Sequence, residues 1–377
     1  MNLVTLAANE NLADASNMLI YSAMAVYALA FLAHIAEWVL GSRSKVARTS
    51  AALGREETGT EPAAGDEAAA AAPAVTVRSG GTTAVLERPR QRSGPKVVTR
   101  SGPAGRPEVP DGPGAAGGDE RGDMYGRIAV SLTVLAFLLH AGCVLVRAIA
   151  VGRAPWANMY EFSTTFSMVV VAGYLGFLLA KKNVRWLGLP LVTTVLLDLG
   201  LAVTVLYNDS TQLVPALDSY WLYIHVSLAI TVGALFYLGA VATVLYLLRD
   251  RHETKLAAGR QPGKLASSVL ERLPSSVSLD KFAYRINAAV FPLWTFTIIA
   301  GAIWAESAWG RYWGWDPKEV WSFITWVFYA AYLHARSTAG WKGRKAAYLA
   351  IAAFACWIFN YYFVNIFFEG LHSYGGV

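Results

Sequence analysis

Residues 220–248 read YWLYIHVSLAITVGALFYLGAVATVLYLL and contain no Asp, Glu, Lys or Arg. A helix of about 20 apolar residues crosses the roughly 30 Å hydrocarbon core of a bilayer, and this run is longer than that. Only helices and closed barrels satisfy their own backbone in lipid, and the period-2 alternation of a barrel strand is absent. The stretch therefore predicts a transmembrane helix.

Seven other apolar runs are long enough to do the same. The whole chain has 377 residues, of which 55% are hydrophobic and only 15% charged. This composition predicts an all-α, polytopic membrane helical bundle with about eight transmembrane helices, and it excludes an ordinary soluble protein. The first run is long enough to remain as a span rather than be removed as a signal peptide. The seven runs lie near 17–40, 126–150, 163–181, 185–207, 288–305, 317–336 and 345–368.

Between the first two spans, residues 42–125 differ in kind, being rich in Ala, Gly, Pro, Arg and Glu with almost no aromatic residues. Such a segment cannot bury enough apolar surface to offset its chain entropy, so it is predicted to be disordered. Three parts follow: an N-terminal transmembrane helix (1–41), a disordered linker (42–125), and a seven-helix membrane domain (126–377).

The basic residues predict the orientation. Of the 32 Lys and Arg residues, 28 fall in segments 42–127, 181–185, 249–285 and 336–345. By the positive-inside rule these segments are cytoplasmic, including the linker, and both termini lie outside. The net charge of +6 is thus explained by topology, and no nucleic-acid partner is predicted. The four remaining basic residues face the outside: Arg147, Arg153, Arg311 and Lys318.

On this outer side lies WGRYWGWDPKE (309–319), part of an aromatic segment at 304–321. His225 lies near the outer end of the 220–248 run, and His372 lies in the C-terminal tail. Flat indole rings with two imidazoles suit a large planar metal complex such as haem, with Arg153, Arg311 or Lys318 to bind its propionates. The alternatives are an interfacial aromatic belt and ordinary interface histidines. The candidate cofactor-binding residues of the segment are Trp304, Trp309, Gly310, Arg311, Trp313, Trp315, Asp316, Glu319 and Trp321.

Asp316 and Glu319 also have a structural interpretation. The order Asp-Pro-Lys-Glu predicts a helix start with Asp316 at the N-cap, Pro317 at N1 and Glu319 at N3. A capped helix end would hold the tryptophan segment rigidly. Likewise, Glu161 and Tyr160 begin a span, where the helix dipole alone favours a carboxylate. Asp198 lies within another span and is expected to face an interior cavity.

The stretch WGRYWGWDPKE fits the WGxxWxWDxxE pattern of the WWD domain of haem-handling proteins, and PWANMYEF (155–162) resembles an outer loop of the same family. Residues 126–377 resemble the CcsA/ResC type, also called CcsB, of the System II cytochrome c synthase. The resemblance implies that the WWD segment binds haem b outside the bacterial cytoplasmic membrane, with His225 and His372 as axial ligands. The linker 42–125 departs from compact family members.

The resemblance also implies haem delivery through the membrane and thioether attachment to the CxxCH motif of apocytochrome c. The partner would be a ResB-type protein, and the pair would form a holocytochrome c synthase. The two cysteines of this chain, Cys143 and Cys356, form no CxxCH, so the chain does not attach haem to itself.

A histidine also follows the WWD segment in the family, and His334 occupies that place here. At 1.5 Å per residue, His34 and His334 both lie about 26 Å from the outer ends of their spans. We therefore expect His334 to be an inner haem ligand, with His34 or His140 as the second. The alternative is a histidine hydrogen-bonded within the bundle or reaching the interface.

Two other functions remain open at this stage. A membrane cytochrome b subunit for electron transfer would need histidine pairs at both depths and little of the tryptophan segment. A transporter of another amphipathic solute would depend little on histidines.

Overall fold

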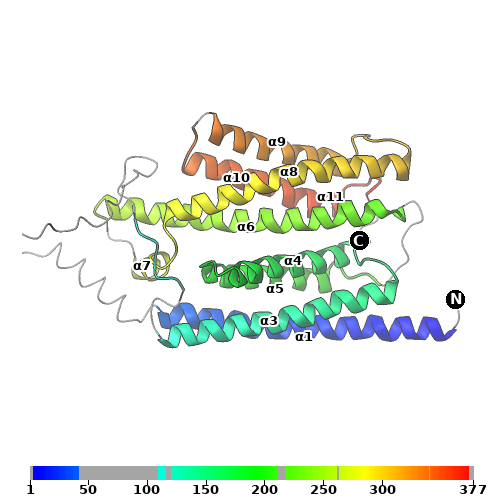
Figure 1. Cartoon of the computed structure of the whole chain (residues 1–377), viewed down its shortest axis with the longest axis horizontal. Coiled ribbons are helices and arrows are strands. Elements are labelled where there is room, and N and C mark those ends of the chain that lie inside the picture. Colours follow the sequence, from blue (N-terminus) through cyan, green and yellow to red (C-terminus); the bar gives the residue numbers. More distant parts are fainter. Residues whose placement is uncertain are drawn as a thin grey trace, which may run out of the picture. The chain divides into compact units, whose positions relative to one another are not determined.

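The computed structural model describes residues 3–41, 109–115, 120–209, 217–260, 263–338 and 340–372, and regular structure in this part of the chain is helical (Figure 1). The all-α bundle is thus confirmed. The elements are α1 (Leu3–Gly41), α3 (Glu120–Val151), α4 (Met159–Leu179), the 3₁₀ turn η1 (Arg185–Leu187), α5 (Gly188–Thr204), α6 (Tyr220–Ala257), α7 (Lys264–Leu270), α8 (Ser276–Trp309), α9 (Pro317–Ser337), α10 (Arg344–Ile358), the π-helical turn η3 (Phe359–Phe363) and α11 (Val364–Phe367).

Seven helical segments in the described residues are long and apolar enough to cross a membrane. The predicted eighth span, 317–336, does form a 21-residue helix, α9, but it is not among the seven. Its two ends carry Lys318, Glu319, His334 and Arg336, which lower the hydropathy of any window long enough to span. The protein is therefore a polytopic membrane protein in which α9 is the most polar of the long helices.

The predicted linker is shorter at its C-terminal end than the composition indicates. Helix α3 begins at Glu120, with Glu120 and Asp123 in its first turn, where carboxylates favour the helix dipole. Residues 109–115 pack on the bundle, since the backbone N–H of Gly112 donates to the carbonyl of Leu273 at 3.1 Å. The prediction of disorder is wrong for these residues, and its remainder, 42–108 and 116–119, lies outside the described residues.

Helices α1 and α3 pack along each other through small residues (Figure 1). Ala23 and Ala30 on α1 and Ala129 and Ala136 on α3 are all fully buried. Within each helix the two alanines are seven residues apart, which places them on one face. Small side chains let helix backbones approach closely, which is the usual way that helices associate in lipid. Helices α4 and α5 pack together, and α6 packs against α8.

An ion-pair cluster, in which only Glu37 is fully buried, joins α1 and α3 to η1. Arg185 of η1 donates to Glu37 of α1 at 2.6 Å and to Asp123 of α3 at 2.6 Å. The side chain of Glu37 is fully buried, and its other carboxylate oxygen lies 3.3 Å from Nδ1 of His34. One guanidinium therefore ties together three segments that are far apart in sequence.

We predict that Arg185→Ala lowers the free energy of unfolding by about 3 kcal/mol, because it leaves the Glu37 carboxylate buried without its cation. Thermal unfolding of the detergent-solubilised protein measures this. The matched control is Arg127→Ala, whose ion pair with Asp123 at 3.4 Å is exposed on both sides and should be worth less than about 1 kcal/mol. Equal effects of the two changes would contradict the assignment.

Candidate functional site

A cavity lies where the start of α6 and the end of α8 meet the start of α9 and the C-terminal residues. Its lining residues come from the 152–158 loop, α4, Leu217, α6, α8, the 310–316 turn, α9, α10, η3, α11 and the tail. Six of the predicted site residues line it: His225, Trp304, Trp309, Trp313, Glu319 and His372. The two outer histidines, widely separated in sequence, thus share one cavity with three of the predicted tryptophans.

The ring of His225 is held between α6 and α8. Its Nδ1 lies 2.9 Å from the carbonyl oxygen of Thr297. A carbonyl only accepts, so Nδ1 carries the proton, and in a neutral imidazole the lone pair lies on Nε2. Gly301 makes room for the ring, because a Cβ there would lie 2.6 Å from Cε1 of His225. The Trp304 ring lies 5.8 Å away, centroid to centroid.

His372 is held by Asp316. Its Nδ1 lies 2.9 Å from Oδ1 of Asp316, and its ring contacts the Trp309 ring edge-on at 4.9 Å. Burial works against ionisation of Asp316, but hydrogen bonds from the His372 ring and from two backbone N–H groups hold its pKa below the usual value. An ionised carboxylate accepts a hydrogen bond from Nδ1–H, so the proton stays on Nδ1 and the imidazole lone pair again lies on Nε2.

Asp316 does more than the predicted capping. The capping box is confirmed: Asp316 Oδ1 accepts from the backbone N–H of Lys318 at 2.9 Å, and Glu319 Oε2 accepts from that of Asp316 at 3.0 Å. In addition, Asp316 Oδ2 accepts from the backbone N–H of Leu371 at 2.7 Å. The same carboxylate therefore begins α9 and fixes the tail that carries His372.

Glu319 folds the turn before it. One carboxylate oxygen accepts from the backbone N–H of Gly314 at 2.8 Å, and the other pairs with Nη1 of Arg311 at 3.1 Å. Gly310, with φ of 69°, is the left-handed C-cap of α8, a conformation that glycine adopts without strain. Arg311 and Gly310 therefore shape the turn, and neither lines the cavity.

The five tryptophans of the segment have different surroundings. Trp304, Trp309 and Trp313 line the cavity. Trp315 has a left-handed backbone, with φ of 60°, and is 67% exposed, so its ring lies outside the cavity. Trp321 packs on Phe359 of η3 at 4.1 Å and joins α9 to the π-helical turn. Only part of the aromatic excess thus belongs to the cavity.

Three further tryptophans line the cavity that the sequence did not identify as site residues: Trp156, Trp294 and Trp357. The indole N–H groups of Trp156, Trp294 and Trp304 are buried and have no hydrogen-bond partner. Buried donors are normally paired, so three unpaired donors in one cavity mark a place for acceptor atoms of a ligand. Trp294, Thr297, Gly301 and Trp304 follow one another at helical spacing on α8, a signal that could have identified Trp294.

Of the three basic residues considered for propionates, Lys318 alone lines the cavity. Its Nζ donates to the Asn360 carbonyl and to Oδ1 of Asn365, each at 2.9 Å. Asn360 belongs to η3, and π-helical turns of this kind are frequent at functional sites. Arg153 pairs instead with Glu161 at 2.8 Å.

The three inner histidines are not brought together. His334 is exposed on α9, with Nδ1 3.2 Å from the Thr338 hydroxyl. His34 is fully buried beside Glu37 and Gly188, and His140 is fully buried beside Tyr27. Both therefore lie in the part of the bundle formed by α1, α3 and α5, away from α9. Similar depth along two helices did not place the side chains in one site.

Asp198 is buried in α5, and hydroxyl groups surround it rather than open space. It accepts from Ser163 at 3.4 Å and from the hydroxyls of Ser167 and Tyr362. Ser163 in turn is hydrogen-bonded to Tyr361, which lines the cavity. Asp198 is thus linked to the cavity through two hydroxyls and does not line it.

The fold and site define an all-helical, polytopic membrane protein with an imidazole- and tryptophan-lined cavity at one end of its bundle. The family described as "Cytochrome C assembly protein" matches residues 131–372, and the chain belongs to this family, among the CcsA proteins. The "Cytochrome c biogenesis protein CcsA" of Synechococcus sp. (strain JA-3-3Ab) is 33% identical over 298 residues, covering 67% of this chain and 85% of the relative.

Two more relatives carry the same description. The protein of Prochlorococcus marinus subsp. pastoris is 38% identical over 262 residues, covering 65% of this chain and 82% of its own length. That of Trieres chinensis is 36% identical over 251 residues, covering 61% of this chain and 80% of its own length. The protein's role is therefore in cytochrome c biogenesis.

We predict that Asp316→Asn loosens the tail that carries His372. Asparagine caps a helix as well as aspartate does, but it offers one acceptor oxygen where Asp316 uses two. Hydrogen exchange of residues 368–372, measured by mass spectrometry, should become about tenfold faster, equivalent to about 1.4 kcal/mol.

The control is Ser219→Ala, which removes the N-cap of α6 without touching the tail. It should lower the thermal midpoint and leave exchange in the tail unchanged. The role of Asp316 would be contradicted if hydrogen exchange of the tail became faster in the Ser219 variant. It would also be contradicted if exchange of the tail were unchanged in the Asp316 variant.

Proposed function

We propose that the chain binds haem b in this cavity, with His225 and His372 as axial ligands, and presents it at the outer membrane face. There the cysteine thiols of a CxxCH motif in apocytochrome c form thioethers with the haem vinyl groups. The observation that carries the proposal is that two imidazoles from distant parts of the chain line one cavity, each with Nδ1 hydrogen-bonded to an oxygen acceptor.

The donor set fits haem. An axial histidine binds iron through its neutral ring nitrogen, and a hydrogen bond from the other nitrogen fixes the tautomer and ring orientation. Both histidines have that second bond. The three unpaired indole N–H groups and Lys318 suit carboxylate oxygens such as propionates, and the aromatic walls suit a flat macrocycle.

The chain's own contribution is orientation. The substrate supplies the thiol nucleophile, so no side chain here has to act as a covalent catalyst. The capping box, the Arg311–Glu319 pair and Asp316 fix the walls before a ligand arrives, which favours reaction by positioning. A ResB-type protein completes the synthase in this proposal, and apocytochrome c is the protein substrate.

The proposal includes passage of haem from the inner side. His334 is the ligand candidate that remains from this chain, because it is exposed on α9 whereas His34 and His140 are buried among other helices. Orientation follows the basic residues: both termini lie outside, and 42–125 lies in the cytoplasm of a bacterial cell. The cytoplasmic membrane is the location.

The alternative, a cytochrome b subunit for electron transfer, requires two histidine pairs. All six histidines lie within the described residues, and His225 and His372 are the two that line this cavity. His252, for example, contacts Glu271 at 3.4 Å near the other end of α6. This distribution favours one outer site over two stacked permanent haems.

We predict that His225→Ala and His372→Ala each reduce the haem that copurifies with the protein and abolish maturation of c-type cytochromes. Absorption spectra of the purified protein and haem staining of membrane cytochromes measure the two effects. Added imidazole should restore part of the spectrum by occupying the vacated position.

The matched control is His252→Ala, on the same helix as His225 but outside the cavity. It should leave both readouts unchanged. Normal cytochrome c maturation in the His225 and His372 variants would refute the proposed function.

We further predict that Trp294→Phe weakens haem binding about tenfold, because phenylalanine keeps an aromatic wall but removes an N–H donor worth about 1.4 kcal/mol to a charged acceptor. Titration with haem measures the change. Trp186→Phe is the control, since its indole N–H already donates to the Asn183 carbonyl at 2.9 Å outside the cavity. An unchanged affinity for Trp294→Phe would argue against a ligand carboxylate at this donor.

A further inference from the structure

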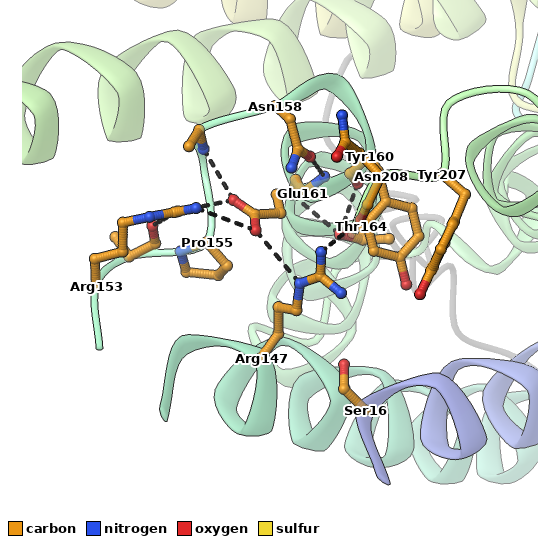
Figure 2. A network of polar contacts seen from close by, with 12 residues as sticks. Ser16, Arg147, Arg153, Pro155, Asn158, Tyr160, Glu161, Thr164, Tyr207 and Asn208 are labelled. Carbon is orange, nitrogen blue, oxygen red and sulfur yellow. Dashed lines mark hydrogen bonds and ion pairs between the residues drawn. The ribbon is translucent and has the colours of Figure 1, made fainter. Parts of the chain in front are cut away.

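We propose that Glu161 is a positioning residue that holds the 152–158 loop so that Trp156 forms part of the cavity wall; this inference builds on the proposed haem site. Glu161 itself does not line the cavity. Its carboxylate lies in the first turn of α4, is fully buried, and is surrounded by donors from two other segments (Figure 2).

Both oxygens of the carboxylate are engaged. Oε1 accepts from Nε of Arg147 at 3.3 Å and from Nη2 of Arg153 at 3.5 Å. Oε2 accepts from Nη1 of Arg153 at 2.8 Å and from the backbone N–H of Ala157 at 2.9 Å. Figure 2 shows the two guanidinium groups approaching from different sides, one from α3 and one from the loop. Charged hydrogen bonds of this kind are stronger than neutral ones.

These contacts tie the loop at its two ends. At the first end, Arg153 binds the carboxylate and also donates to the carbonyl of Ala154 at 2.9 Å. At the second end, Ala157 binds the carboxylate, and the Asn158 side chain accepts from the backbone N–H of Glu161 at 2.8 Å. The residues between these two attachments are 155 and 156, and Thr165 donates to the Pro155 carbonyl at 3.5 Å, so the carboxylate limits where Trp156 can lie.

Trp156 reaches the site together with its loop neighbours Ala157 and Asn158. It lines the cavity, and its ring contacts Tyr223 of α6 edge-on at 6.2 Å. Tyr223 precedes His225 by two residues. The position of the Trp156 ring therefore bears both on the cavity wall and on the helix that presents a proposed axial ligand.

The cluster is itself anchored to a third segment. Nη2 of Arg147 donates to the carbonyl of Asn208, after α5, at 2.7 Å, and its guanidinium lies 5.1 Å above the Tyr160 ring (Figure 2). Helix α3, helix α4 and the chain after α5 thus meet at one buried carboxylate. A helix-dipole role for Glu161 would not require any of these partners.

Replacement by glutamine tests the assignment sharply. Every contact to the carboxylate comes from an N–H donor, and glutamine has one acceptor oxygen and one NH₂ group. Glu161→Gln must therefore place a donor against a donor on one side, although the side chain has nearly the same shape. Glu161→Asp keeps the charge and shortens the reach, and serves if the glutamine variant does not fold.

The first experiment needs no ligand. Hydrogen exchange of the peptide covering 153–160 is measured by mass spectrometry on the full chain in lipid nanodiscs. In Glu161→Gln or Glu161→Asp it should be at least tenfold faster than in the unmodified protein. The control is Asp280→Asn, which removes a carboxylate from the ion pair with Arg336 at the opposite end of α8 and should leave this peptide unchanged. Unchanged exchange in the Glu161 variants would overturn the proposal.

The second experiment asks whether Glu161 acts through Trp156. Haem affinity is measured for Glu161→Gln, Trp156→Ala and the double variant. Each single change should lower haem affinity about tenfold. The double variant should bind haem as well as the single variant with the lower affinity, because the two residues act as one unit. Additive losses would overturn the proposal. If the unmodified protein binds no haem, the proposed function fails, and the exchange experiment still decides the role of Glu161.

Discussion

Inside hydrocarbon every polar group needs a hydrogen-bonding or ionic partner. This constraint determines the helical fold, and polar groups left without a partner indicate where a ligand site lies. The backbone meets the constraint by forming helices, and buried side chains such as Asp198, Glu37 and Glu161 meet it with three or more donors or a guanidinium. Among the buried side-chain atoms of the described residues that have no partner, the indole N–H groups of Trp156, Trp294 and Trp304 belong to residues that line the same cavity. Because they surround one cavity, they mark the place where a ligand would complete the structure.

Carboxylates at helix starts organise both sides of that cavity in the same way. Glu161 in the first turn of α4, and Asp316 and Glu319 at the start of α9, each accept backbone N–H groups from the loop or tail nearby. A carboxylate is favoured at this position by the helix dipole, and its second oxygen is then available for a distant segment. The protein thereby fixes three irregular segments with side chains that also stabilise the helix ends.

The sequence was sufficient where one-dimensional pattern determines the outcome. Apolar run length predicted the helices, and Asp-Pro-Lys-Glu predicted the cap of α9. The sequence was insufficient where the rotation of a helix about its axis, or a single backbone angle, decides which side chains share a site. Trp315 and Trp313 look equivalent in the sequence, but Trp313 lines the cavity, whereas Trp315 has a left-handed backbone and an exposed ring outside it. Depth along a span likewise could not reveal that His34 and His334 belong to different faces of the bundle.

The two cavity histidines are anchored by different means, and the difference has a structural consequence. His225 is held by one helix against another, through the Thr297 carbonyl and the space left at Gly301. His372 lies after the last helix and reaches its position because Asp316 binds both its ring and the adjacent backbone. Asp316 in turn is fixed by the start of α9, whose turn is folded by Glu319. A cavity with both imidazoles in place therefore exists only when the tail is docked on α9, so the pair is a property of the tertiary structure and of no single helix.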